Sequence, residues 1–287
     1  MKRLLLAAFV AALMLVPASS ASAALTGEYA RFSTCPLSNP AVEYCLSAES
    51  TSGQFTVGKK TVPLVNPQTL RGAVGGPEGI AGPLTFYAPT DGVVLSKSPQ
   101  PVPGGLLGVT APSWWPQILK DLFNETINNG FTGVTATVEL AGPTSAIKAS
   151  FINALTGSGT VFGLPVKVKL SNPFLGSNCY VGSNSNPINL NLITGTTSPP
   201  PPNTPITGFA GEGGNIEEKI LYLKKNKLVD NSFAAPGASG CGGFLFSWAV
   251  DPLVDSILGT PSPAGTNTAI LEGTTYLGIA AALRPML

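Results

Sequence analysis

Residues 134–140 read Val-Thr-Ala-Thr-Val-Glu-Leu, with an apolar side chain at every second position. The same period of two occurs in residues 166–170, Val-Lys-Val-Lys-Leu, and in residues 188–192, Ile-Asn-Leu-Asn-Leu. Successive side chains of a β-strand point to opposite faces of the sheet. The pattern therefore predicts three strands that each have one buried face and one polar face.

Weaker alternation extends this prediction along the chain. It predicts strands at residues 44–49, 54–57, 60–65, 92–96, 146–153 and 160–163. Residues 219–233 are predicted to form a hairpin that turns at Lys224-Lys225-Asn226. A last pair of strands, residues 268–272 and 275–282, is predicted to turn at Gly273.

Two helices are predicted. The longer one is expected to start at Ser113, a favourable N-cap, and to end before Gly130. Apolar side chains at three- and four-residue spacings are expected to pack this helix on the sheet; they are Trp115, Ile118, Leu119, Leu122, Phe123 and Ile127. The shorter helix is predicted over residues 252–258, with Asp251 as its cap and Gly259 as its end.

The predicted fold is mainly β. The 33 glycines and 27 prolines favour short strands joined by turns over long helices. We expect an antiparallel β-sandwich or a partly closed β-barrel, with one amphipathic helix and one short helix. The proline-rich residues 198–205 predict a polyproline II segment. We expect it to belong to a surface loop near residues 196–215; an interdomain linker is the alternative.

Residues 1–23 have the features of a secretory signal peptide. Lys2 and Arg3 precede an uncharged apolar run over residues 4–16, and Ala21-Ser22-Ala23 offers small residues for cleavage. We therefore expect residues 24–287 to form a single secreted β-rich domain, extracellular or associated with the cell surface. Loss of the two basic residues leaves 14 basic against 15 acidic residues, a net charge of −1.

Four cysteines follow this segment. An even number in an exported chain predicts two disulfides, and three pairings are possible. We favour Cys35–Cys45, which closes a short loop, together with Cys179–Cys241, which joins distant segments. No Cys-x-x-Cys pair is present, so the sequence predicts neither a metal site nor another cofactor.

The composition argues against several classes of function. A nearly neutral chain lacks the basic surface that nucleic-acid binding needs. The chain contains no histidine, which excludes the usual histidine-dependent triads and metalloprotease sites. Once the signal is removed, no stable membrane insertion is expected, because the remaining apolar runs are short.

The candidate site residues are aromatic. Trp114, Trp115 and Tyr180 are candidates for stacking against a ligand, although Trp115 also belongs to the apolar stripe of the predicted helix. The alternative is a pair of catalytic carboxylates, for which Glu139, Asp251 and Asp255 are the residues considered. No catalytic residue is assigned, since no motif selects a pair of carboxylates.

One resemblance bears on location. The signal segment and phrases such as Phe-Leu-Gly-Ser-Asn-Cys-Tyr at residues 174–180 and Pro-Ser-Pro-Ala-Gly-Thr-Asn at residues 261–267 resemble exported proteins of unknown function from high-GC Gram-positive bacteria. This resemblance implies export and no particular activity.

We expect a secreted, non-enzymatic protein with a structural, cell-surface or ligand-binding role. Its candidate partner is a cell-surface component or a glycan. A carbohydrate-active enzyme that uses carboxylates is the alternative. A lipid-binding or pore-forming exoprotein is a weaker one, and it would have a long amphipathic hairpin or an apolar cavity.

Overall fold

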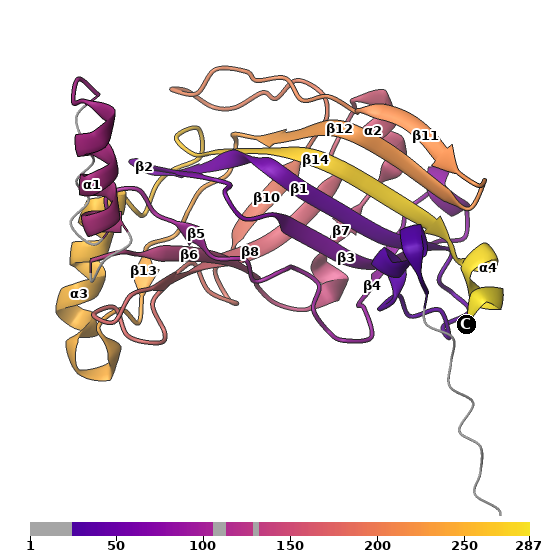
Figure 1. Ribbon diagram of the computed structural model, residues 1–287, viewed down its shortest axis with the longest axis horizontal. Helices are drawn as coiled ribbons and strands as arrows, with labels where there is room; N and C mark the ends of the chain where they lie inside the picture. Colours follow the sequence, from indigo (N-terminus) through magenta and orange to yellow (C-terminus); the bar gives the residue numbers. More distant parts are fainter. Residues whose placement is uncertain (1–24, 106–112, 129–131) are drawn as a thin grey trace, which may run out of the picture.

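A computed structural model of the chain describes residues 25–105, 113–128 and 132–287. Two antiparallel β-sheets face each other and enclose the main core (Figure 1). The mainly β, sandwich-like fold is thereby confirmed. The predicted signal segment, residues 1–23, lies outside the described residues.

The first sheet contains the longest strands. Its order is β11-β12-β14-β1-β3-β4, with β2 also paired to β1. The strands are β1 (Tyr44–Val57), β2 (Lys60–Pro63), β3 (Gln68–Gly75), β4 (Thr85–Tyr87), β11 (Glu212–Ile216), β12 (Ile220–Asp230) and β14 (Thr268–Ile279). β1 and β14 pair over almost their whole length, from Tyr44 opposite Ile279 to Thr56 opposite Thr268.

The second sheet holds all three of the clearly alternating stretches. Its order is β13-β9-β8-β6-β5, and β10 and β7 also pair with β8. The strands are β5 (Gln100–Pro101), β6 (Thr135–Leu140), β7 (Lys148–Ala149), β8 (Phe162–Ser171), β9 (Tyr180–Val181), β10 (Ile188–Leu192) and β13 (Ala238–Ser239). Reciprocal backbone hydrogen bonds between Ile193 and Val229 join this sheet to β12.

Both predicted hairpins are wrong, for one physical reason. β12 and β14 run straight through the expected turns, and the register of β12 against β14 shifts at Lys225, whose φ is 57°. The register of β1 against β14 shifts at Thr51, opposite the same point of β14. β-bulges use the same residue types as turns. A Cβ on Gly273 would collide with the carbonyl oxygen of Glu49, so glycine marks a close approach of strands here.

Other strand predictions need smaller corrections. Residues 44–49 and 54–57 belong to one strand, β1, and residues 160–163 contribute to the start of β8. Residues 92–96 form only an isolated bridge, from Leu95 to Leu70. Residues 146–153 contain the short strand β7 and then the start of a helix, which Ser150 caps by accepting a hydrogen bond from the Asn153 amide.

The described part of the chain contains four α-helices: α1 (Gln117–Asn128), α2 (Phe151–Thr156), α3 (Gly243–Leu258) and α4 (Ala280–Leu283). α1 begins four residues later than predicted, because the Pro116 carbonyl accepts the first helical hydrogen bonds. Its expected stop, Gly130, lies outside the described residues. α3 begins nine residues earlier than predicted and contains Pro252 in its interior, although it ends before Gly259 as expected.

Both predicted disulfides are present: Cys35–Cys45 and Cys179–Cys241. They indicate an oxidising environment, as outside the cytoplasm.

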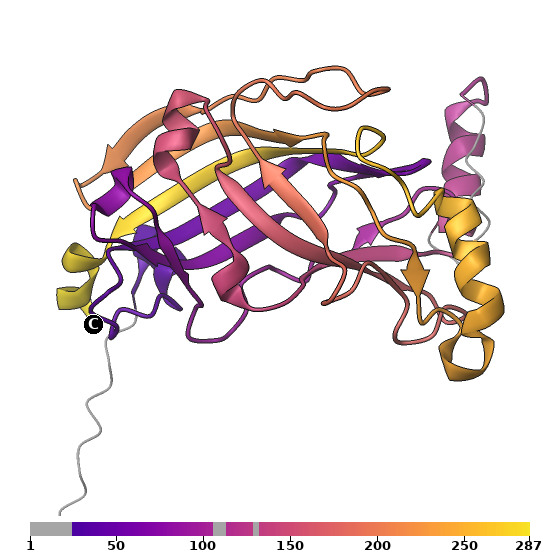
Figure 2. The same cartoon turned by 180° about the vertical axis from the view of Figure 1, so that it is seen from behind.

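The proline-rich segment forms a loop whose two ends are held together by hydrogen bonds. The Thr197 amide donates to the Ile206 carbonyl, and the Ile206 amide donates to the Thr197 hydroxyl. This excursion projects beside the first sheet (Figure 2). It is shorter than predicted, because β11 occupies Glu212–Ile216.

Candidate functional site

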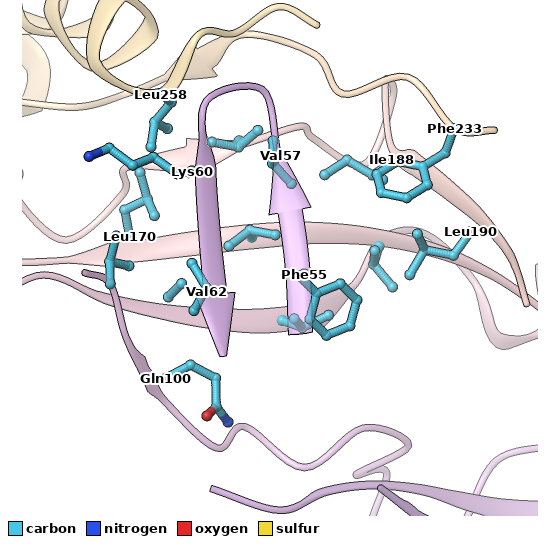
Figure 3. A pocket seen from close by; sticks show the side chains of 16 residues that line it. Phe55, Val57, Lys60, Val62, Gln100, Leu170, Ile188, Leu190, Phe233 and Leu258 are labelled. Atoms are coloured by element: carbon cyan, nitrogen blue, oxygen red, sulfur yellow. The ribbon is translucent and has the colours of Figure 1, made fainter. Parts of the chain in front are cut away.

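An apolar cavity of about 70 Å³ lies between the two sheets. Figure 3 shows β1 and β2 on one side of it and strands of the second sheet behind. Sixteen of the described residues line it: Phe55, Val57, Lys60, Val62, Gln100, Val102, Ala136, Val138, Val166, Val168, Leu170, Val181, Ile188, Leu190, Phe233 and Leu258. Valine and leucine supply most of this wall, so the cavity favours a hydrocarbon over a polar ligand.

The strand alternation explains why these side chains converge. Ala136 and Val138 of β6 face inward between the polar residues Thr135, Thr137 and Glu139. Valine at alternate positions of β8 and leucine and isoleucine of β10 follow the same rule. The apolar residues whose alternation predicts the second sheet therefore also form the wall of the cavity.

The core is incompletely closed at this place. Five inward-facing side chains are only partly buried: Phe55, Val57, Val62, Val138 and Val168. By contrast, Val166 and Val181, which line the same cavity, are each 2% exposed. Because a sandwich interior normally excludes water from inward-facing valines, partial burial of facing residues from both sheets indicates an opening.

Among the lining residues that the structure describes, two are polar, and they have different roles. Gln100 is 4% exposed and its amide is occupied, because it accepts hydrogen bonds from the Val65 and Asn66 amides and donates to the Asn66 carbonyl. Lys60 is half-buried at the edge, with its ammonium directed away from the ring of Phe55 (Figure 3). Among the described residues of the lining, Lys60 alone carries a charge.

The turn between β1 and β2 forms part of the rim and is fastened to the end of α3. The Lys59 amide donates to the Leu258 carbonyl at 2.6 Å, and the Gly58 amide donates to Asn267 Oδ1 at 2.8 Å. Gly58 has φ +57°, and a Cβ there would collide with the carbonyl oxygens of Leu258 and Gly259. Only glycine fits this close approach.

A second, smaller cavity of about 30 Å³ continues toward α3. It shares four lining residues with the first: Lys60, Val102, Leu170 and Leu258. The inner face of α3 closes it through Val254 and Ile257. The apolar space therefore extends from the middle of the sandwich to the helix at its end.

The residues predicted to stack on a ligand lie on different parts of the molecule. Trp114 is 80% exposed beside α1 and meets Trp115 edge-on, with ring centroids 6.1 Å apart. Tyr180 lies next to inward-facing Val181 and therefore faces outward from the second sheet. Its ring contacts the Lys167 ammonium at 4.8 Å, and its pKa is raised by burial and by the charge of Glu139.

The predicted packing of the longer helix on the sheet is wrong. Ile118 is 77% exposed and Leu122 is 62% exposed, and Leu119 is exposed as well. These three side chains lie on the stripe that was expected to be buried. α1 lies at the end of the sandwich instead of covering the face of either sheet (Figure 1).

The carboxylates considered for catalysis have local structural partners. Asp251 does not cap α3 as predicted; from inside the helix it accepts hydrogen bonds from the Gly240 and Cys241 amides. Asp255 accepts from the Ala238 amide and from the Thr260 hydroxyl. Glu139 lies opposite Lys167 on the outer face of the second sheet. Over the residues that the structure describes, no acidic or cysteine side chains cluster as metal ligands.

None of the described helices combines the length and apolarity needed to cross a lipid bilayer. Comparisons of the chain with protein families, with curated proteins and with solved structures found no match. Most of the cavity residues were predicted as ordinary strand residues, whereas Leu258 was predicted at the end of the short helix and Gln100, Val102 and Val181 fell in no predicted strand. The incomplete burial of the cavity wall depends on the distance between the two sheets, and the alternation of apolar and polar residues along a strand does not predict that distance.

Proposed function

We propose that the protein is an exported, non-enzymatic binding protein that holds the apolar tail of a small amphiphile between its two sheets. The observation that carries this proposal is the apolar cavity with part-exposed valines from both sheets. The signal-like residues 1–23 and the two disulfides support export.

The volume of the cavity sets the expected length of the tail. A space of about 70 Å³ provides roughly five or six water-sized positions, and a methylene group is of similar size. We therefore expect the cavity to take a chain of roughly five or six carbons. A longer chain would have to continue into the smaller cavity below α3 or leave through the opening.

Lys60 supports an anionic head group. Its stem lines both cavities, while its ammonium lies at the edge. A lysine whose methylenes follow an apolar wall can keep its charge in water and meet an anion there. A carboxylate on a short alkyl chain fits this combination of an apolar interior and a cationic rim.

The experiment is a chain-length series of straight alkanoates, from propanoate to decanoate, titrated into the oxidised protein and followed by NMR. The dissociation constant should fall about fourfold per added methylene, up to roughly six carbons, and then level off. Methyl signals of Val138 and Val168 should shift. Affinity that does not depend on chain length, or shifts confined to other residues, would refute the proposal.

A matched pair of variants tests the location. Val62 lines the cavity, whereas its neighbour Thr61 is exposed on the opposite face of β2. Val62→Phe should fill the space and weaken hexanoate binding at least tenfold. Thr61→Phe adds the same ring outside and should leave binding unchanged. Equal effects of the two variants would contradict binding between the sheets.

A second comparison tests the head group. Hexanoate should bind more tightly than 1-hexanol to the natural protein, and Lys60→Met should remove this difference while retaining the alkyl contacts. If the difference persists in Lys60→Met, the anion is bound elsewhere.

A further inference from the structure

The outer face of α3 is almost entirely apolar. Eight of its residues are exposed: Phe244, Leu245, Phe246, Trp248, Ala249, Pro252, Leu253 and Ser256. Seven of these eight are apolar, and all belong to the described part of the chain. At 100° per residue they cover about 200° of the helix circumference. Phe244 is 97% exposed and Trp248 is 79% exposed, so neither side chain contributes appreciably to the core.

The charges of α3 lie at one edge of this face and are only partly exposed. Its only ionisable residues are Asp251 and Asp255, and both accept hydrogen bonds from the segment that precedes the helix or from Thr260. The inner face carries Val254 and Ile257, which close the smaller cavity. The helix therefore presents apolar side chains to the cavity and to the exterior, with its carboxylates between them.

α1 adds to the same end of the molecule. Figure 1 shows α1 and α3 together beyond the ends of the sheets, on the side opposite to α4. Trp114 and Ile118 are exposed there, at 80% and 77%. All three tryptophans of the chain, at positions 114, 115 and 248, lie in or beside these two helices. Tryptophan is enriched where a protein meets a membrane interface.

We propose that this apolar end, formed by the outer face of α3 and the exposed residues Trp114 and Ile118 of the α1 region, docks on the hydrocarbon of a lipid bilayer. A protein partner would normally form about one hydrogen bond per 100–200 Å² of interface. Within the described surface of α3, Ser256 is the one exposed polar side chain. The exposed polar residues of neighbouring α1 include Asp121, which accepts a hydrogen bond from Gln117, and Glu125. Hydrocarbon requires neither hydrogen bonds nor charges, so the face complements a lipid surface.

The docking mode is peripheral. An apolar helix face of this width lies in the plane of the interface, with its side chains buried among the acyl chains. This position places the smaller cavity directly behind the membrane-facing helix. The inference extends the proposed function by making the bilayer the source of the amphiphile, but the docking surface itself does not depend on occupation of the cavity.

The experiment is sedimentation of the oxidised protein with vesicles of pure phosphatidylcholine, together with tryptophan fluorescence. We expect the protein to sediment with the vesicles and its emission to shift to the blue. Because the contact is apolar, binding should be unchanged between low salt and 0.5 M salt. Binding that requires anionic lipid and disappears in high salt would overturn the proposal.

Two matched double variants locate the surface. Phe244→Asp with Leu245→Asp should weaken vesicle binding at least tenfold, since two buried apolar side chains are replaced by carboxylates. Ile152→Asp with Leu155→Asp makes the same change on α2, at 42% and 61% exposure and away from the apolar end (Figure 2). The α2 variant should bind vesicles like the natural protein, and equal losses in both variants would overturn the assignment.

Two further results separate this proposal from its alternatives. The α3 variant should still bind hexanoate, whereas Val62→Phe should still bind vesicles, so failure of one site is distinguishable from failure of the other. Light scattering tests self-association through the same face. A dimer that is lost in the α3 variant, without vesicle binding by the natural protein, would assign the face to a second copy and overturn docking on lipid.

Discussion

The two ends of the sandwich each have helices and a disulfide, but apolar side chains are buried at one end and partly exposed at the other. At one end, the 3-10 helix η1 (Gly27–Phe32), the disulfide Cys35–Cys45 and α4 close a separate apolar core. At the other end, α3 covers the smaller cavity through Val254 and Ile257, the disulfide Cys179–Cys241 lies just before α3, and α1 lies beside α3. We refer to them as the closed end and the open end.

Apolar packing holds the closed end. Phe32, Val42, Ile220 and Leu283 are each at most 2% exposed. Arg284 completes the cap by donating hydrogen bonds to the carbonyls of Leu37, Asn39 and Val42. These apolar side chains belong to the separate core of this end.

Hydrogen bonds hold the open end. Asn267 is fully buried and connects the β1–β2 turn to Ser262 and Phe233 through both ends of its amide. Asp251 and Asp255 fasten α3 to the residues before it. Because polar groups fix this frame, the aromatic and aliphatic residues of α3 remain free for the cavity and for the outer surface. The two ends thus differ in where their apolar residues are placed: in the core at the closed end, and partly on the surface at the open end.

The largest expected effect compares the two disulfides. Cys179 and Cys241 are 62 residues apart, and Cys35 and Cys45 are 10 apart. Replacing each pair by serine should lower the free energy of unfolding by about 4 kcal/mol at the open end and about 3 kcal/mol at the closed end. Urea denaturation of the two double variants measures both values. A larger loss at the closed end would show that packing outweighs loop length.

A second pair of substitutions compares apolar residues from the two ends. Leu283 is fully buried at the closed end, and Phe244 is almost fully exposed at the open end. Leu283→Ala should cost about 3 kcal/mol of unfolding free energy, whereas Phe244→Ala should change it by less than about 0.5 kcal/mol. A comparable loss for Phe244→Ala in urea denaturation would contradict its exposure and the membrane proposal with it.

Asn267 tests the polar frame of the open end. Asn267→Ala removes the acceptor of the Gly58 amide and leaves buried partners unsatisfied, so it should cost about 2 kcal/mol. Hydrogen exchange should quicken at Gly58 and the neighbouring turn while remaining slow at Ala280 in the closed end. Uniform acceleration at both ends would mean that the two ends open together.

The smallest expected effect is a pH dependence at Asp230, whose carboxylate accepts from the Asn191 amide of β10 and the Ser232 amide. Burial raises the pKa of Asp230 above its usual value, despite these hydrogen bonds, which lower it. Between the unfolded and folded pKa values the folded protein binds more protons, so its stability should fall as pH rises through that window. Asp230→Asn should remove this slope in urea denaturation between pH 4 and 7; an unchanged slope would assign it to other groups.

Much of the fold was predictable because strand alternation is a local property. The period of two in β6, β8 and β10 reflects one buried face, and it correctly placed these strands. Loop lengths also favoured the correct disulfide pairs. The β-bulges at Lys225 and Thr51 were mistaken for turns or strand breaks, since only pairing with β14 distinguishes them.

The sequence predicted individual features of the candidate site but not the site itself. The sequence by itself determined which strand residues are apolar, that the cysteines pair, and that α3 ends at Gly259. The sequence also shows that one face of α1 is apolar, but an apolar face does not specify which segment of the chain covers it. Only the tertiary structure decided that the sheets separate around the cavity and that α1 and α3 turn apolar residues outward. The physical reason is that hydrophobicity is a property of each residue, whereas burial depends on which distant segments meet.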